Sequence, residues 1–84
     1  MTSDDERIER LRARLAERNV DEKDIERISA SLHRVAAINR LVASGLSYPQ
    51  ARTAVAREWR ITEQALLDEA TFTQYRLQGL MIRL

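Results

Sequence analysis

Hydrophobic side chains recur along this chain at spacings of three and four residues, the pattern of amphipathic helices, and no segment alternates as a β-strand does. The pattern predicts four helices, over residues of about 4–18, 22–44, 48–60 and 63–82. The polar breaks between them contain residues that favour helix N-caps, namely Asp21, Ser47 and Thr62. We therefore expect an all-α fold, a compact four-helix domain over residues 1–84.

The second predicted helix carries the most regular apolar row of the chain. Its members follow a strict alternation of three- and four-residue steps: Ile25, Ile28, Leu32, Val35, Asn39 and Val42. Such a row packs lengthwise against one or two neighbouring helices. The polar Asn39 within it either pairs with Asn39 of a second copy at a symmetric seam, or caps a backbone group or faces solvent within one bundle.

The fourth predicted helix is apolar on two nearly opposite sides. One stripe contains Leu66, Ala70, Thr73, Leu77, Leu80 and Leu84, and the other contains Phe72, Tyr75 and Ile82. A single small domain covers one such stripe, so the second predicts a homodimer. The residues expected at the interface are Asn39, Phe72, Leu77, Leu80, Met81 and Leu84. Gly79 either lies within a continuous helix, which we favour, or ends it and releases an apolar docking tail.

Length and composition add to the case for association. The chain has 84 residues and no cysteine, so neither a disulfide nor a thiolate metal site stabilises its small core. Burial of further apolar surface in an oligomer is the expected remedy. The first residues are acidic and contain no apolar run, and no window has the apolar length of a membrane span, so we expect a cytoplasmic protein.

The net charge of +1 is unevenly distributed along the chain. Residues 27–60 contain six arginines and one acid, whereas residues 1–26 contain nine acids and six bases. The first predicted helix also aligns four arginines on one flank, Arg7, Arg10, Arg14 and Arg18. This row either faces phosphates or an acidic partner, or is a solvated edge in which Glu6 pairs with Arg10 and Arg14 with Glu17.

The sequence contains little that favours catalysis. His33 is the only histidine, and no acid lies three or four residues from it to orient its ring. The acids around Asp24 lack the glycine and spacing of a calcium loop. We therefore expect a non-enzymatic protein with no catalytic residues, metal, cofactor or small-molecule substrate.

The third and fourth predicted helices, with the short break between them, have the layout of a helix-turn-helix. The expected inner corner consists of Val55, Ala56, Trp59, Ile61 and Leu66. Arg57 and Arg60 would then contact phosphates, and Thr62 and Gln64 would lie near base edges of duplex DNA. Against this layout, Arg60 stands where such turns usually have glycine, and three acids, Glu63, Asp68 and Glu69, lie on the fourth helix.

Two classes of function remain open at this point. The first is a small regulator that binds DNA through the helix-turn-helix-like corner. The alternative is a protein-interaction module, such as an antitoxin, an inhibitor or a phage or plasmid adaptor, acting through its apolar helix faces. The two differ in their response to salt, because phosphate contacts weaken steeply as salt rises and apolar contacts do not.

Overall fold

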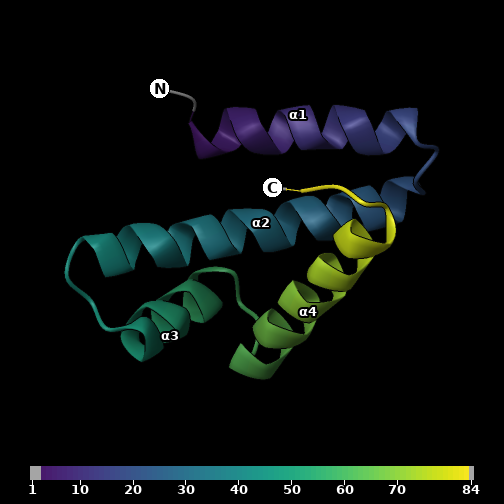
Figure 1. Cartoon of the computed structure of the whole chain (residues 1–84). Coiled ribbons are helices and arrows are strands. Elements are labelled where there is room, and N and C mark those ends of the chain that lie inside the picture. The colour runs from purple at the N-terminus through teal and green to yellow at the C-terminus, as the bar shows by residue number, and fades with distance from the viewer. Residues whose placement is uncertain (1–2, 84) are drawn as a thin grey trace.

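The protein is all-helical over residues 3–83, the part of the chain that the computed structural model describes. Its helices are α1 (Asp4–Glu17), α2 (Glu22–Ala43), α3 (Tyr48–Glu58) and α4 (Glu63–Gly79). The long α2 is the central element, with α1 along one side of it and α3 on the opposite side (Figure 1). α4 runs back from α3 towards the N-terminal half of α2 (Figure 1). The predicted four-helix, all-α fold is confirmed.

Local polar contacts fix the starts of the helices. The side chain of Asp21 accepts a hydrogen bond from the Lys23 amide at 2.9 Å, and the Thr62 hydroxyl accepts one from the Ala65 amide at 3.0 Å. Ser47 forms a reciprocal capping box with Gln50 at the start of α3. All three predicted caps therefore occupy N-cap positions, where each satisfies a backbone donor that the helix itself leaves free.

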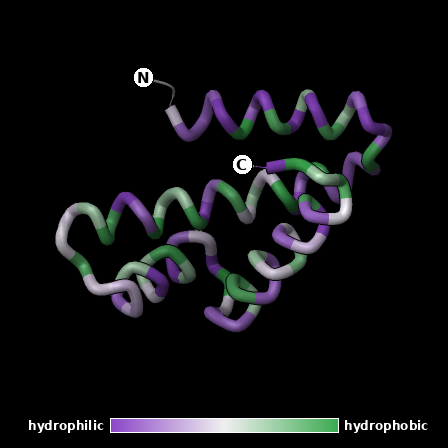
Figure 2. The backbone as a smooth tube through the Cα atoms, viewed as in Figure 1, coloured by the Kyte–Doolittle hydropathy of each residue, from purple (hydrophilic) through white to green (hydrophobic). Residues whose placement is uncertain are grey.

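The core consists of two apolar clusters that share α2. The first joins α1, α2 and the end of α4 through Leu11, Leu15, Ile25, Ile28, Leu77 and Ile82. The second joins α2, α3 and the start of α4 through Ile38, Ala51, Val55, Ala56 and Leu66. Hydrophilic positions dominate the outer side of α1 (Figure 2). The clusters therefore hold α1 and the α3–α4 corner to different parts of the same helix.

All four helices end in the same way, with one residue in the left-handed region. These residues are Asn19, Gly45, Arg60 and Met81, with φ values of 60°, 115°, 55° and 58°. In each case the next amide donates to a carbonyl five residues earlier, as in the bond from Ile82 to Leu77 at 2.9 Å. This is the Schellman motif, in which an apolar residue after the turn packs back on the helix.

The fourth predicted helix therefore needs a correction at its C-terminus. α4 ends at Gly79 rather than near residue 82, because the chain turns at Met81. Ile82 is then 5% exposed and lies in the first core cluster, with Leu80 packed against it. The burial of Ile82 covers this apolar side chain within the same molecule. Residues 80–83 are therefore neither a continued helix nor a released docking tail.

The left-handed residue at Met81 leads to a first prediction. Met81 is 87% exposed, so its replacement by glycine removes little packing while relieving the steric cost of its backbone conformation. We expect Met81→Gly to raise the free energy of unfolding by about 0.5 to 1 kcal/mol, measured by urea denaturation. Gly45→Ala is the matched control and should lower it, because a Cβ there meets strain at φ 115° although no atom lies within 4 Å.

Candidate nucleic-acid interface

The α3–α4 corner is built on small and branched apolar residues. Val55, Ala56 and Leu66 are 0%, 4% and 2% exposed, and Ile61 packs against their cluster. Trp59, which we expected in this corner, is instead 39% exposed. It occupies the C-cap of α3, and the guanidinium of Arg34 lies 5.1 Å from its ring centroid. The tryptophan therefore forms a cation–π contact at the surface.

The turn between α3 and α4 has the backbone conformation that a glycine usually supplies in a helix-turn-helix. Arg60 takes φ 55° without being glycine. The amide of Ile61 then donates to the carbonyl of Ala56 at 3.0 Å, which closes the end of α3 before Thr62 starts α4. The missing glycine thus changes the energy of this turn and not its shape. The absence of glycine at this position is therefore no argument against a helix-turn-helix corner.

The predicted DNA-contacting residues are all exposed at this corner, but they are not equally free. Arg57 and Arg60 make no ion pair within residues 3–83. The Thr62 hydroxyl is occupied as acceptor in its cap. The Gln64 amide nitrogen donates to the Asp68 carboxylate at 2.9 Å. Gln64 must therefore exchange that bond before it can present both donor and acceptor to an adenine edge.

Two of the three acids on α4 are neutralised by arginines. Glu63 accepts hydrogen bonds from Arg52 at 3.0 Å and from Thr53 at 3.2 Å. Glu69 accepts two from Arg27, at 2.9 and 3.1 Å. These arginine hydrogen bonds lower the pKa of both carboxyl groups. The paired acids thus oppose an approaching phosphate less than their number in the sequence suggests.

The same ion pairs predict that the free energy of unfolding depends on pH. The pKa of Glu63 and that of Glu69 are lowered from the ordinary value of 4.5, so the folded state binds fewer protons than the unfolded state around that pH. The stabilisation is therefore present above pH 4.5 and is lost as the pH falls through the lower folded values. Urea unfolding between about pH 6 and 3 should show this loss, reduced in Glu63→Gln and Glu69→Gln.

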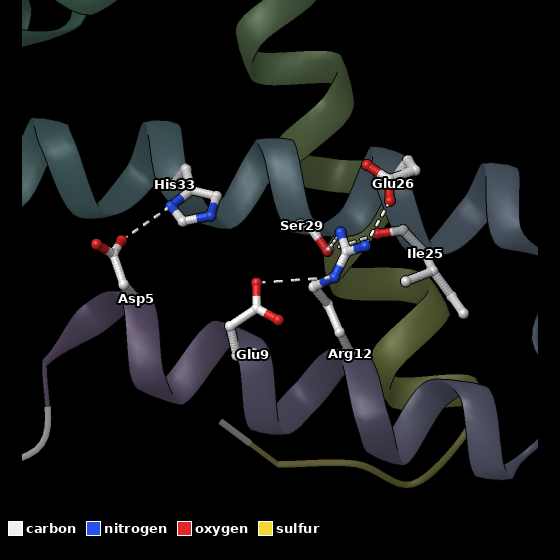
Figure 3. A network of polar contacts seen from close by, with 7 residues as sticks. All are labelled: Asp5, Glu9, Arg12, Ile25, Glu26, Ser29 and His33. Atoms are coloured by element: carbon white, nitrogen blue, oxygen red, sulfur yellow. Dashed lines mark hydrogen bonds and ion pairs between the residues drawn. The ribbon is translucent and has the colours of Figure 1, made fainter.

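A second polar network joins α1 to α2 (Figure 3). Arg12 donates to Glu26 at 2.6 Å and to the hydroxyl of Ser29 at 3.2 Å, and Glu9 lies 3.9 Å away on the same side of α1. His33 Nδ1 lies 3.4 Å from the carboxylate of Asp5, an acid that is distant from it in sequence. Neighbours in sequence could not show this contact, because Asp5 comes from another helix.

The described residues contain neither a candidate metal centre nor a membrane span. Over residues 3–83, no three His, Cys, Asp or Glu side chains gather as metal ligands would. Within the same range no helix has the length and apolarity needed to cross a bilayer. The contact between Asp5 and His33 joins α1 to α2.

The residues predicted for a dimer interface separate into different environments. Leu77 is 4% exposed in the first core cluster, and Leu80 packs against that cluster, so both side chains contact their own chain. Phe72 is half-buried, with the guanidinium of Arg27 over its ring at 3.7 Å. Asn39 and Met81 are exposed. Leu84 lies outside the described residues.

Comparison with known proteins adds no relative. No protein-family model matches the chain, and the searches of curated proteins and of solved structures also find no match.

Proposed function

We propose that this protein is a small, non-enzymatic regulator that binds duplex DNA through the α3–α4 corner. The observation that carries the proposal is the left-handed turn at Arg60, which joins two helices over a buried corner of Val55, Ala56 and Leu66. This is the arrangement that lets the second helix of a helix-turn-helix present its N-terminal half to the major groove.

The exposed side of α4 supports this orientation. Gln64, Leu67, Asp68 and Thr71 are exposed and lie on the side of α4 away from the buried Leu66 and Thr73, and Thr62 is exposed at the N-cap. Arg57 and Arg60 lie at the end of α3, beside the start of this surface. In the proposed complex the two arginines contact phosphates and fix the register. Gln64 then contacts a base edge from the first turn of α4.

The direct test is a salt titration of binding to random duplex DNA, followed by fluorescence anisotropy. We expect micromolar affinity at about 50 mM salt that falls steeply by about 200 mM, because each phosphate contact releases counterions. Light scattering on the same samples gives the mass of the bound species. Absence of binding at the lowest salt would contradict the proposal.

We further propose that the protein acts as a homodimer through the C-terminal half of the α2 row. Ile25 and Ile28 are buried within the chain, whereas Val35 is half-buried, Asn39 is exposed and Val42 is 40% exposed. A second copy on this half of the row would bury Val35 and Val42 and bring the two Asn39 side chains together. Such a dimer would present two α4 helices to two half-sites.

A protein partner is the second candidate, and one observation favours it. A cleft of about 210 Å³ between α1 and α2 is lined mainly by apolar side chains, among them Ile8, Leu11, Leu32, Val35 and Ala36. An apolar helix face fits such a surface. Binding through this cleft would persist at salt concentrations that abolish phosphate contacts, and this difference separates the two candidates.

A further inference from the structure

A cationic cleft lies between α1 and the C-terminal segment. It is lined by Arg7, Arg10, Arg14, Leu11 and Arg83, and its volume is about 540 Å³. All four arginines are exposed, and the floor of the cleft is the buried Leu11. Among residues 3–83, no carboxylate lines the cleft. Four like charges are therefore gathered where a bound anion would offset their repulsion.

These arginines differ from most others in the described part of the chain. Arg12, Arg27, Arg40, Arg52 and Arg76 each form an ion pair with a carboxylate. Within residues 3–83, the four arginines of the cleft form none. The local pairs of Glu6 with Arg10 and of Arg14 with Glu17, the alternative that the sequence offered, are likewise not formed there. The exposed arginines of the row on α1 are thus not neutralised by the local pairs that the sequence suggested.

The position of Arg83 is fixed by the fold. The guanidinium of Arg18 on α1 donates a hydrogen bond to the carbonyl of Leu80, and the next residues turn at Met81. Ile82 is then buried in the first core cluster, immediately before Arg83. The C-terminal segment lies beside α1 and α2 in Figure 1. Arg83 is thereby held across the cleft from the three arginines of α1.

We propose that this cleft binds the phosphate backbone of a nucleic acid, at a surface separate from the α3–α4 corner. Arg7, Arg10 and Arg14 lie three and four residues apart, which corresponds to axial steps of roughly 4.5 and 6 Å. These steps span one to two nucleotides of a duplex strand, which rises roughly 3.4 Å per nucleotide. Planar guanidinium groups bind phosphate oxygens in pairs. No aromatic residue lines the cleft, so contact there is with the backbone and independent of sequence.

The placement of the cleft gives it a distinct role. α1 packs along α2, and α1 and α3 lie on opposite sides of α2 (Figure 1). A duplex on the α3–α4 corner therefore leaves the cleft open to a second segment of nucleic acid. The protein would then bridge two segments of nucleic acid. This bridging role rests on the proposed function, whereas phosphate binding by the cleft does not.

The test compares two double variants that remove equal charge from the two surfaces. Arg10→Ala with Arg14→Ala alters the cleft, and Arg57→Ala with Arg60→Ala alters the α3–α4 corner. All four side chains are exposed, so both proteins should fold, which circular dichroism checks. Binding to a random duplex is measured by anisotropy between about 50 and 200 mM salt, on each variant and on the combined fourfold variant.

In the parent the corner binds the duplex without the cleft, so the cleft substitutions alone should change the affinity little. In the corner variant, where the cleft is the remaining phosphate-binding surface, the same substitutions should weaken duplex binding about tenfold at about 50 mM salt, with a salt slope reduced by about 2 for the two lost phosphate contacts. If they leave affinity and slope unchanged in the corner variant, the inference is overturned. If the corner variant alone binds like the parent, the proposed function fails, while a loss in the fourfold variant still supports the cleft.

A competitor identifies the chemistry of the anion. Poly-L-glutamate at the same charge concentration as the duplex is added to the corner variant, whose remaining binding reports on the cleft. We expect the duplex to remain bound, because the cleft is assigned to phosphates. Displacement of the duplex by poly-L-glutamate at equal charge would overturn the assignment and indicate an acidic protein segment instead.

Discussion

Replacement of Leu77 by alanine is expected to lower the free energy of unfolding by about 2 to 5 kcal/mol. Leu77 is 4% exposed and lies where α4, α2, α1 and the C-terminal segment meet, beside Leu15, Ile28 and Ile82. The substitution removes apolar contacts to several elements at once and leaves a cavity that the surrounding helices can only partly close. For a domain of this size the melting temperature should fall by roughly 8 to 40 °C.

The matched control for this substitution is Met81→Ala, four residues further along the chain. Met81 is 87% exposed, so its truncation should change the free energy of unfolding by less than about 0.5 kcal/mol. Thermal and urea unfolding measure both variants. Because Leu77 is buried within its own chain, the mass of the folded variant in solution should match that of the parent. An unchanged melting temperature would show that Leu77 does not lie in the core.

The helices and their starts could be predicted from the sequence because both depend on neighbouring residues. The apolar row from Ile25 to Val42 has the period of one helix face, and a capping residue such as Ser47 bonds within its own first turn. The first residue of each of the four helices agrees with the prediction. Local periodicity and capping were sufficient for this part of the fold.

The end of the fourth helix could not be predicted in the same way, whereas the first three helices end within two residues of the predicted bounds. The left-handed residue after the fourth helix is Met81, which is neither glycine nor asparagine, so the usual signal for a helix end was missing there. The apolar residue that follows it, Ile82, is buried by tertiary contacts with the core. The heptad-like spacing of the last residues resembled a continuing helix, and only the packing against α1 and α2 distinguishes the two.

The electrostatic character of the candidate site was also hidden from the sequence. Glu63 and Glu69 were counted against DNA binding because each is an acid on α4. Their partners, Arg52 and Arg27, lie 11 and 42 residues away in sequence, and the fold brings them within hydrogen-bond distance. In the part of the chain that the structure describes, Arg57 and Arg60 have no ion pair. Net charge along the chain thus identified the basic middle segment but not which of its arginines are available.

The α2 row links the fold to its expected assembly. One helix face serves two purposes, because its N-terminal half is covered by α1 and α4 whereas Val35, Asn39 and Val42 remain at least partly exposed. A periodic row in a sequence therefore predicts burial without indicating which molecule provides it. The argument for a second copy now depends on this half of α2, since Leu77 and Leu80 pack within their own chain.

Removal of Arg57 and Arg60 is expected to weaken DNA binding about tenfold or more at every DNA sequence tested, at about 50 mM salt. The two side chains are exposed near the break between α3 and α4, and in the proposed complex a phosphate there would meet both their charge and the free amides of α4. The double alanine variant should also show a salt slope lower by about 2. Competition between unrelated duplexes, followed by anisotropy, measures both quantities.

Gln64→Ala is the contrasting substitution, because Gln64 is neutral and is assigned to a base edge. It should leave binding to random duplex almost unchanged and reduce the preference at a single base-pair position of a selected site by about 1 to 3 kcal/mol. Selection of preferred sites by the parent and by the variant measures this preference. If Gln64→Ala instead weakens all sequences equally, or if the arginine pair affects only some of them, α4 does not enter the groove in the proposed orientation.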